Sequence, residues 1–219
     1  MAVADPWQQA KDVIGDTRVT LGPQASDQYL NAPDHLAMVL ARYRAAAALI
    51  GDAQHVSELG CGEAIGAGIL MKGRKTYIGF DQDGAAIEVA RAHYPELLFL
   101  KLDILHHLFV PCGSDAVVSL DVIEHLPANR ENDLMGAITA HLTDHGVCVI
   151  GTPNAAFEHL ASPQSKAGHV NLYTHERLHA LMRKHFRVVQ SFGMQDTSLH
   201  LGHPDARHYL LMAGIGPVR

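Results

Sequence analysis

The segment SLDVIEHLP, residues 119–127, places three ionisable groups within five residues at the end of an apolar run. Asp121, Glu124 and His125 have the spacing i, i+3 and i+4, which puts them on one side of a helical turn. His125 could serve there as a general base that takes a proton from a substrate hydroxyl, with Glu124 beside it. This interpretation makes His125 and Glu124 the catalytic residues.

A second interpretation of the same segment is a divalent-cation site, because two carboxylates and an imidazole are suitable ligands. The predicted metal ligands are then Asp121, Glu124, His125 and, from the later segment GHVNLY, His169. A bound cation would lower the pKa of a hydroxyl, and mixed oxygen and nitrogen ligands do not choose among Mg, Mn and Zn. A third interpretation, in which Glu124 and His125 only start a helix, also remains open.

The segment SELGCGEAIGAG has the pattern of a nucleotide-binding turn between a strand and a helix. Gly60 and Gly62 allow a tight turn and a close approach of the backbone to a ligand. Glu58 at the end of the strand favours a cationic group over a pyrophosphate. Asp81 and Asp103 end the next two strands, where an acid can bind ribose hydroxyls or an adenine amine. Acids at three successive strand ends indicate one ligand site.

Strands and helices alternate in the way that a parallel sheet with two covered faces requires. The apolar patterns predict strands at residues 55–59, 76–80, 97–102, 116–120 and 146–153, helices at residues 33–51, 84–93, 129–143 and 174–185, and final strands at residues 186–194 and 206–214. No helix fits between the final two strands, so they should pair antiparallel. We expect one domain over residues 1–219, with an irregular arm (1–32) and an α/β core (33–214).

Composition excludes several classes of protein. The 219 residues are 47% hydrophobic and carry a net charge of −6, which argues against a duplex-DNA or anionic-membrane partner. The three cysteines, Cys61, Cys112 and Cys148, form no CxxC pair and fit a reducing compartment. The sequence shows neither a signal-peptide pattern nor an apolar run of membrane-spanning length. We therefore expect a cytoplasmic protein without a membrane span.

Taken together, the motifs resemble those of class I S-adenosylmethionine-dependent methyltransferases over roughly residues 35–214. ELGCG is similar to the first motif of that family, GFD to the second, LD at residues 102–103 to the adenine motif, SLDVIEHLP to the fourth and GVCVIGTPN to the fifth. The pattern D-x-x-E-H-L-P, followed by TPN and GHVNLYTHERLHALM, further resembles ubiquinone-biosynthesis O-methyltransferases of the type 11–23 branch. It also resembles uncharacterised methyltransferases encoded among bacterial polysaccharide genes.

The resemblance implies a Rossmann-like, mostly parallel sheet of seven strands with helices on both faces. The implied strand order is 3-2-1-4-5-7-6, with strand 7 antiparallel. It also implies that Glu58, Gly60 and Gly62 face the methionine part of the cofactor, Asp81 the ribose and Asp103 the adenine. The implied cofactor-binding set comprises Glu58, Gly60, Cys61, Gly62, Asp81, Gln82, Asp103, Ile104 and Leu120.

The expected function is S-adenosylmethionine-dependent O-methylation of a small-molecule hydroxyl, with a sugar or sugar phosphate as the leading acceptor class; whether a divalent cation (Mg, Mn or Zn) is a second cofactor stays open at this point. Small-RNA terminal 2′-O-methyltransferases carry a similar Glu-His pattern with a later histidine, so RNA is the alternative acceptor. The acidic net charge opposes RNA. A third expectation is a partner module that binds the cofactor without catalysis, which the acids at positions 58, 81 and 103 oppose.

Overall fold

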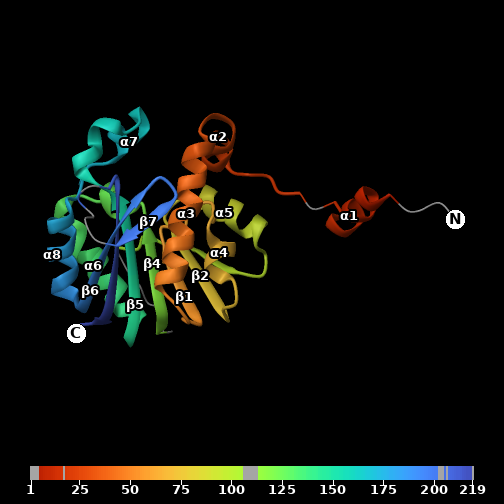
Figure 1. The fold of residues 1–219 in the computed structure, drawn as a ribbon. Coiled ribbons are helices and arrows are strands. Elements are labelled where there is room, and N and C mark those ends of the chain that lie inside the picture. The colour runs from red at the N-terminus through yellow and green to blue at the C-terminus, as the bar shows by residue number, and fades with distance from the viewer. Residues whose placement is uncertain (1–4, 17, 106–112, 202–204, 206, 219) are drawn as a thin grey trace.

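The computed structural model describes residues 5–16, 18–105, 113–201, 205 and 207–218. In these residues, helices cover both faces of a single sheet of eight strands (Figure 1). The strand order is β3-β2-β1-β4-β5-β8-β6-β7. The first five strands in this order pair in parallel, whereas β8 is antiparallel to both β5 and β6. The predicted Rossmann-like class is confirmed.

The strands are β1 (His55–Leu59), β2 (Thr76–Asp81), β3 (Leu98–Lys101), β4 (Ser114–Leu120), β5 (Leu142–Pro153), β6 (Phe186–Gln195), β7 (Ser198–Leu201) and β8 (Tyr209–Pro217). The antiparallel pairing of the two long C-terminal strands is as predicted, with Val189 opposite Gly214. The short strand β7 is additional and brings the count to eight rather than seven. It forms because Asp196 adopts a positive φ of 52°, so that the chain reverses and Gln195 pairs with Ser198.

The larger helices divide between the two faces of the sheet. One face is covered by α3 (Pro33–Leu49), α4 (Ala67–Met71) and α5 (Gly84–His93), and the other by α6 (Glu131–His141) and α8 (His175–His185). Shorter helices follow β4 and β5: η1 (Ile123–His125), η2 (Ala128–Arg130), η3 (Ala155–Leu160) and α7 (Pro163–Gly168). Each face has its own hydrophobic core, so the sheet is buried on both sides, as a parallel sheet requires.

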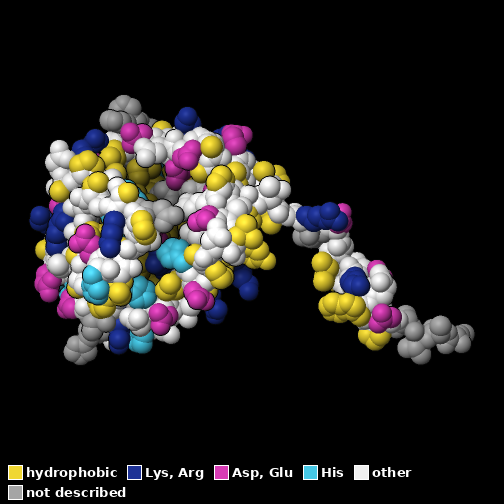
Figure 2. All heavy atoms as spheres, turned by 90° about the horizontal axis from the view of Figure 1, so that it is seen from above, with side chains coloured by type: hydrophobic (Ala, Val, Ile, Leu, Met, Phe, Trp, Pro, Cys, Tyr) yellow, Lys and Arg dark blue, Asp and Glu magenta, His cyan; other side chains and the backbone are white. Residues whose placement is uncertain are grey.

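The expectation that residues 1–32 form an irregular arm was wrong, because this segment contains α1 (Pro6–Ile14) and α2 (Pro23–Asn31). Both helices begin with proline, whose fixed φ suits the first helical position. Asp5 also caps α1 by accepting a hydrogen bond of 3.0 Å from the backbone N–H of Trp7. Helix α1 buries no residue and projects away from the main body (Figures 1 and 2).

Two further expectations concern cysteines and membranes. Cys61 and Cys148 are buried free thiols, and Cys112 lies outside the described residues. Across the part of the chain that the structure describes, every helix is too short or too polar to cross a bilayer.

Candidate active site

A cavity of about 1010 Å³ lies at the carboxyl ends of the parallel strands. Its walls come from the segments that follow β1, β2, β3, β4 and β5, together with α2, α3, η3 and α7. In Figure 1, α2 and α7 stand on opposite sides of this end of the sheet. The position agrees with the general rule that open α/β sheets bind ligands at the carboxyl ends of their strands.

The glycine turn after β1 forms one side of the cavity. The backbone N–H groups of Gly60 and Cys61 donate to the carbonyl of Phe80 at 2.8 and 3.0 Å, which fixes the turn to β2. Gly60 has a φ of +80°, and a Cβ on it would lie 2.2 Å from a methyl group of Val122. Gly62 has a φ of +51° and would meet nothing within 4 Å, so its open side is available for a ligand to approach the backbone.

Most of the predicted cofactor-binding residues gather around this turn. The Asp81 carboxylate accepts hydrogen bonds from the N–H groups of Gly62, at 2.8 Å, and Asp83, at 2.9 Å. Asp103 accepts one from the N–H of Leu105 at 2.9 Å. The predicted residues that line the cavity are Gly60, Cys61, Gly62, Asp81, Gln82, Asp103, Ile104 and Leu120. Asp81 and Asp103 therefore border the same cavity as the glycine turn.

Glu58 is placed differently, because it is completely buried and is not among the described residues that line the cavity. Its carboxylate accepts hydrogen bonds from the hydroxyl of Tyr43, at 2.7 Å, and from the hydroxyl of Tyr77. Burial raises the pKa of Glu58 to about 7, although the two tyrosine hydroxyls act in the opposite direction. Glu58 thus supports the glycine turn from behind. The two tyrosines were missed because their apolar surroundings indicated only core positions.

Asp121 is held by an arginine that the sequence analysis also missed. Nη1 of Arg42, on α3, lies 2.9 Å from both oxygens of the Asp121 carboxylate. The guanidinium also stacks on the ring of Tyr209, with 4.0 Å between its central carbon and the ring centroid. Asp121 has a φ of +56°, and its N–H donates to the carbonyl of Gly151. Its carboxylate is therefore engaged with Arg42 and lies outside the cluster formed by the other predicted metal ligands.

Glu124, His125 and His169 form that cluster, with one possible ligand atom from each residue within 4.8 Å of the others. Glu124 is completely buried: Oε2 accepts a hydrogen bond of 3.0 Å from the hydroxyl of Thr152, whereas Oε1 has no partner among the described residues. A buried carboxylate oxygen without a partner is costly unless a ligand reaches it. Oε1 of Glu124 is therefore a candidate ligand atom.

A hydrogen bond to the backbone sets the tautomer of His125 in this cluster. Nδ1 of His125 lies 2.9 Å from the carbonyl oxygen of Gly168. Because a carbonyl only accepts, Nδ1 must carry the proton, and Nε2 is left free to bind a cation or a proton. The ring centroids of His125 and His169 are 5.0 Å apart. Burial lowers the pKa of His169, and the neighbouring His125 lowers it further.

The loop that carries His169 is attached directly to the turn that carries Glu124. The N–H groups of Val170 and Asn171 donate to the carbonyl of Glu124 at 2.9 and 3.1 Å. Burial, and then the nearby charge of Asp121, raises the pKa of Glu124 to about 8. These backbone contacts hold the His169 loop against the Glu124 turn, and a cation placed there would favour the ionised form of Glu124.

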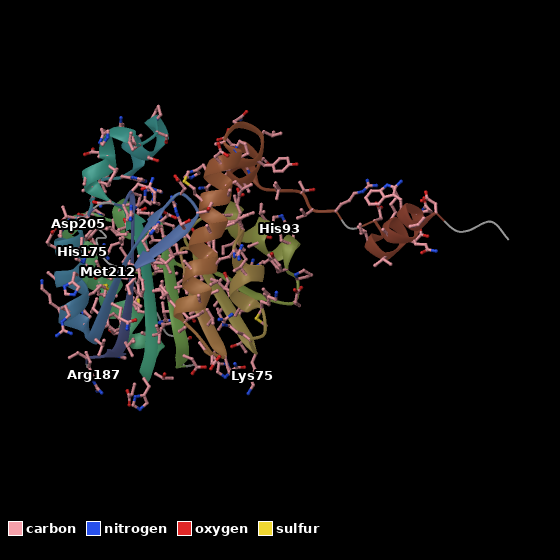
Figure 3. The ribbon with its side chains drawn as sticks, viewed as in Figure 1. Lys75, His93, His175, Arg187, Asp205 and Met212 are labelled. Atoms are coloured by element: carbon pink, nitrogen blue, oxygen red, sulfur yellow. The ribbon has the colours of Figure 1, made fainter. Side chains whose placement is uncertain are left out.

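A second group of possible ligands, His175, Glu176 and Asp205, lies outside the cavity lining. His175 and Asp205 are labelled in Figure 3, and their facing ring nitrogen and carboxylate oxygen are 3.4 Å apart. His175 and Glu176 are the first two residues of α8. The positive end of the helix dipole disfavours a cation there. We interpret this group as a contact between His175 and Asp205 outside the cavity rather than as a metal site.

Comparisons with known proteins agree with this geometry. A family model described as a methyltransferase domain matches residues 34–191. A curated protein of Mycolicibacterium smegmatis, named a probable S-adenosylmethionine-dependent methyltransferase, is 36% identical over 104 residues, which cover 45% of this chain and 38% of that protein. The chain thus spans well under half the length of this curated relative.

Two solved structures share the fold at low sequence identity. The methyltransferase domain of bacterial CtHen1 has a TM-score of 0.68 and 16% identity, covering 83% of this chain and all of that one. The N-methyltransferase NodS of Bradyrhizobium japonicum, in complex with S-adenosyl-L-homocysteine, has a TM-score of 0.63 and 18% identity, covering 84% of this chain and 87% of that one. At these identities the likeness establishes the fold alone.

Proposed function

Because the chain belongs to the methyltransferase-domain family, we propose that it transfers the methyl group of S-adenosylmethionine to a hydroxyl oxygen of a small molecule. When bound, this cofactor supplies a methyl group on a positively charged sulfur, which a nucleophilic oxygen can attack. The protein must then hold the cofactor and the acceptor in one cavity, exclude water and remove the proton of the acceptor hydroxyl.

The residues around the glycine turn fit the cofactor. The bare backbone at Gly62 leaves a cradle that any side chain would fill. Asp81 would accept hydrogen bonds from the two ribose hydroxyls, and Asp103, which lines the same cavity, would accept one from an adenine amine. Asp81 is already fixed by two backbone N–H groups, so little ordering is needed on binding.

The observation that carries the proposed acceptor chemistry is the cluster of Glu124, His125 and His169, whose two histidines border the same cavity. The partnerless Oε1 of Glu124 and the free Nε2 of His125 suit a divalent cation, which would lower the pKa of an acceptor hydroxyl and orient it. Asp121 is excluded from the proposed ligand set because Arg42 engages its carboxylate. His125 acting alone as a base is the competing proposal.

The acceptor class that we favour is a sugar or a sugar phosphate. Polar side chains line the cavity on the sides formed by α2 and α7. They include Gln28 of α2, Ser162 at the N-cap of α7 and Lys166 within α7. Hydroxyl-rich molecules need such hydrogen-bonding partners, and a phosphate would suit Lys166.

A methyl-transfer screen combined with metal removal tests the proposal. The protein would be supplied with S-adenosylmethionine and with nucleotide sugars, polysaccharide fragments, quinol precursors and RNA oligonucleotides. With the right acceptor, we expect activity that is lost on treatment with a strong chelator and restored by magnesium, manganese or zinc.

Matched variants separate the cation from the base. Glu124→Ala should abolish transfer while S-adenosylmethionine still binds, and Glu88→Ala, on the exposed side of α5, should change neither property. If chelation has no effect and His125→Ala lowers the rate roughly 10²- to 10⁴-fold, His125 is a base and the cation is rejected. Full activity of a folded His125→Ala protein would reject both roles.

A further inference from the structure

Helix α2 covers one side of the cavity, and its first turn has no capping group of its own. Gln24, Ala25, Asp27 and Gln28 of this helix line the cavity. The preceding residue, Gly22, offers no side chain, and the first turn contains no acidic residue. The first N–H groups of a helix have no partner within the helix and must find one elsewhere. We call α2 the lid helix.

The partner comes from the glycine turn, 39 residues further along the chain. The carboxylate of Glu63 accepts hydrogen bonds from the N–H of Gln24, at 3.0 Å, and from the N–H of Ala25, at 2.9 Å. A negative charge at this position also interacts favourably with the helix dipole. Glu63 therefore caps the lid helix from the cofactor side of the cavity.

The lack of a side chain at Gly22 leaves space for the contact between Glu63 and the lid helix. A Cβ on Gly22 would lie 2.3 Å from the carboxyl carbon of Glu63. Its φ of −71° and ψ of 174° are open to any residue, so the backbone does not require glycine here. Room for the Glu63 carboxylate is thus the reason for glycine at this position.

A second contact holds the chain just before the lid helix. Nε2 of His93 lies 2.7 Å from the carbonyl oxygen of Thr20. His93, labelled in Figure 3, is the last residue of α5. The segment 20–25 is therefore attached at two points, to α5 through His93 and to the glycine turn through Glu63.

We propose that Glu63 is a positioning residue that attaches the lid helix to the glycine turn, so that cofactor binding and closure of the acceptor cavity are coupled. This inference rests on the proposed function. The preceding residue, Gly62, donates its N–H to Asp81, and Glu63 accepts from the lid helix. A ligand that orders the turn therefore also orders the lid helix, which makes acceptor binding more favourable when the cofactor is present.

Hydrogen exchange of the full chain, followed by mass spectrometry, measures the contact directly. The readout is the exchange rate of peptides covering residues 20–31, with and without S-adenosylhomocysteine as the probe. We expect Glu63→Ala to speed exchange there about tenfold, as the loss of one charge-assisted contact would. Glu63→Gln, which keeps an acceptor oxygen without the charge, should restore part of the protection. Glu88→Ala removes an exposed carboxylate elsewhere and should change nothing.

Gly22→Ala disturbs the same contact from the other side, because its added methyl group displaces the Glu63 carboxylate. It should match Glu63→Ala, and the double variant should exchange no faster than Glu63→Ala alone. Additive effects, or unchanged exchange in a folded Glu63→Ala protein, would overturn the assignment of Glu63.

The probe tests the coupling and separates it from the proposed function. In the unaltered protein, S-adenosylhomocysteine should slow exchange both at residues 58–66 and at residues 20–31. In Glu63→Ala it should slow exchange only at residues 58–66. Equal protection of residues 20–31 in both proteins would overturn the coupling. A protein that fails to bind the probe contradicts the proposed function and with it the coupling, whereas the ligand-free comparison still decides whether Glu63 holds the lid helix.

Discussion

Replacing Glu58 with glutamine should remove a pH dependence of stability that the buried carboxylate imposes. Glutamine has nearly the same shape and remains uncharged at every pH. Its oxygen can accept from one of the two tyrosine hydroxyls, and its amide can donate to the oxygen of the other, so the hydrogen bonds to Tyr43 and Tyr77 can be kept. The variant therefore changes the charge and little else.

The size of the effect follows from the pKa of Glu58, which burial raises from 4.5 to about 7 in the folded protein. A carboxyl group with a raised pKa contributes stability that is complete below pH 4.5 and is lost as the pH rises through about 7. One pKa unit corresponds to about 1.4 kcal/mol, so the loss between pH 5 and pH 8 is on the order of 2–3 kcal/mol. The glutamine variant should not show it.

Urea denaturation at pH 5, 6, 7 and 8, followed by circular dichroism, measures the difference between the two proteins. The free energy of unfolding of Glu58→Gln relative to the unaltered protein should rise with pH across this range. Other titrating groups cancel in this difference. Glu88→Gln serves as a control and should give a difference that is the same at each pH. A constant difference for Glu58→Gln would show that Glu58 is not held as a raised-pKa carboxyl.

Three further predictions concern the cavity. Asp81→Ala should weaken S-adenosylmethionine binding roughly 10- to 100-fold by calorimetry, because the proposed binding mode makes Asp81 the acceptor for two ribose hydroxyls; an unchanged affinity in a folded variant would refute the assignment. Arg42→Met should lower the free energy of unfolding by about 3 kcal/mol, because it leaves the Asp121 carboxylate without its partner. A much smaller loss, measured by urea denaturation, would show that the Arg42–Asp121 pair contributes little to stability. If the proposed cluster binds manganese, Thr152→Val should weaken that binding about tenfold, because it removes the hydroxyl that donates to Glu124; titration of the unaltered protein provides the reference.

The sheet and its cofactor side could be predicted because their signals are local. The alternation of apolar strands with helices sets the order of the elements, and the glycine pair and the acids directly follow strands. The additional strand β7 could not be predicted, because it depends on the positive φ of Asp196 in a polar segment. The helices α1 and α2 were not predicted, because Pro6 and Pro23 were interpreted as breaks in regular structure, whereas each begins a helix.

The orientation of Glu58 follows from the alternation of side chains along β1. Alternate residues of a strand share a face, so Glu58 lies on the same side of β1 as Val56, which packs in the core beneath α3. Arg42 is different, since it meets Asp121 across 79 positions of sequence and lies in a helix whose pattern indicates only packing. Contacts of that kind depend on how the helix is seated on the sheet, and a local pattern does not contain that information.

Two consecutive residues of helix α3, Arg42 and Tyr43, contact opposite parts of the site. Arg42 engages Asp121 beside the proposed acceptor cluster, whereas Tyr43 bonds Glu58 and packs its ring against Gly66, behind the glycine turn. Consecutive residues on a helix point about 100° apart, so inserting or deleting one residue in α3 would misdirect both side chains together. The position of α3 relative to the sheet is therefore fixed by two contacts. Relatives that evolve toward new acceptors should accumulate their changes on the opposite side of the cavity, in η3 and α7.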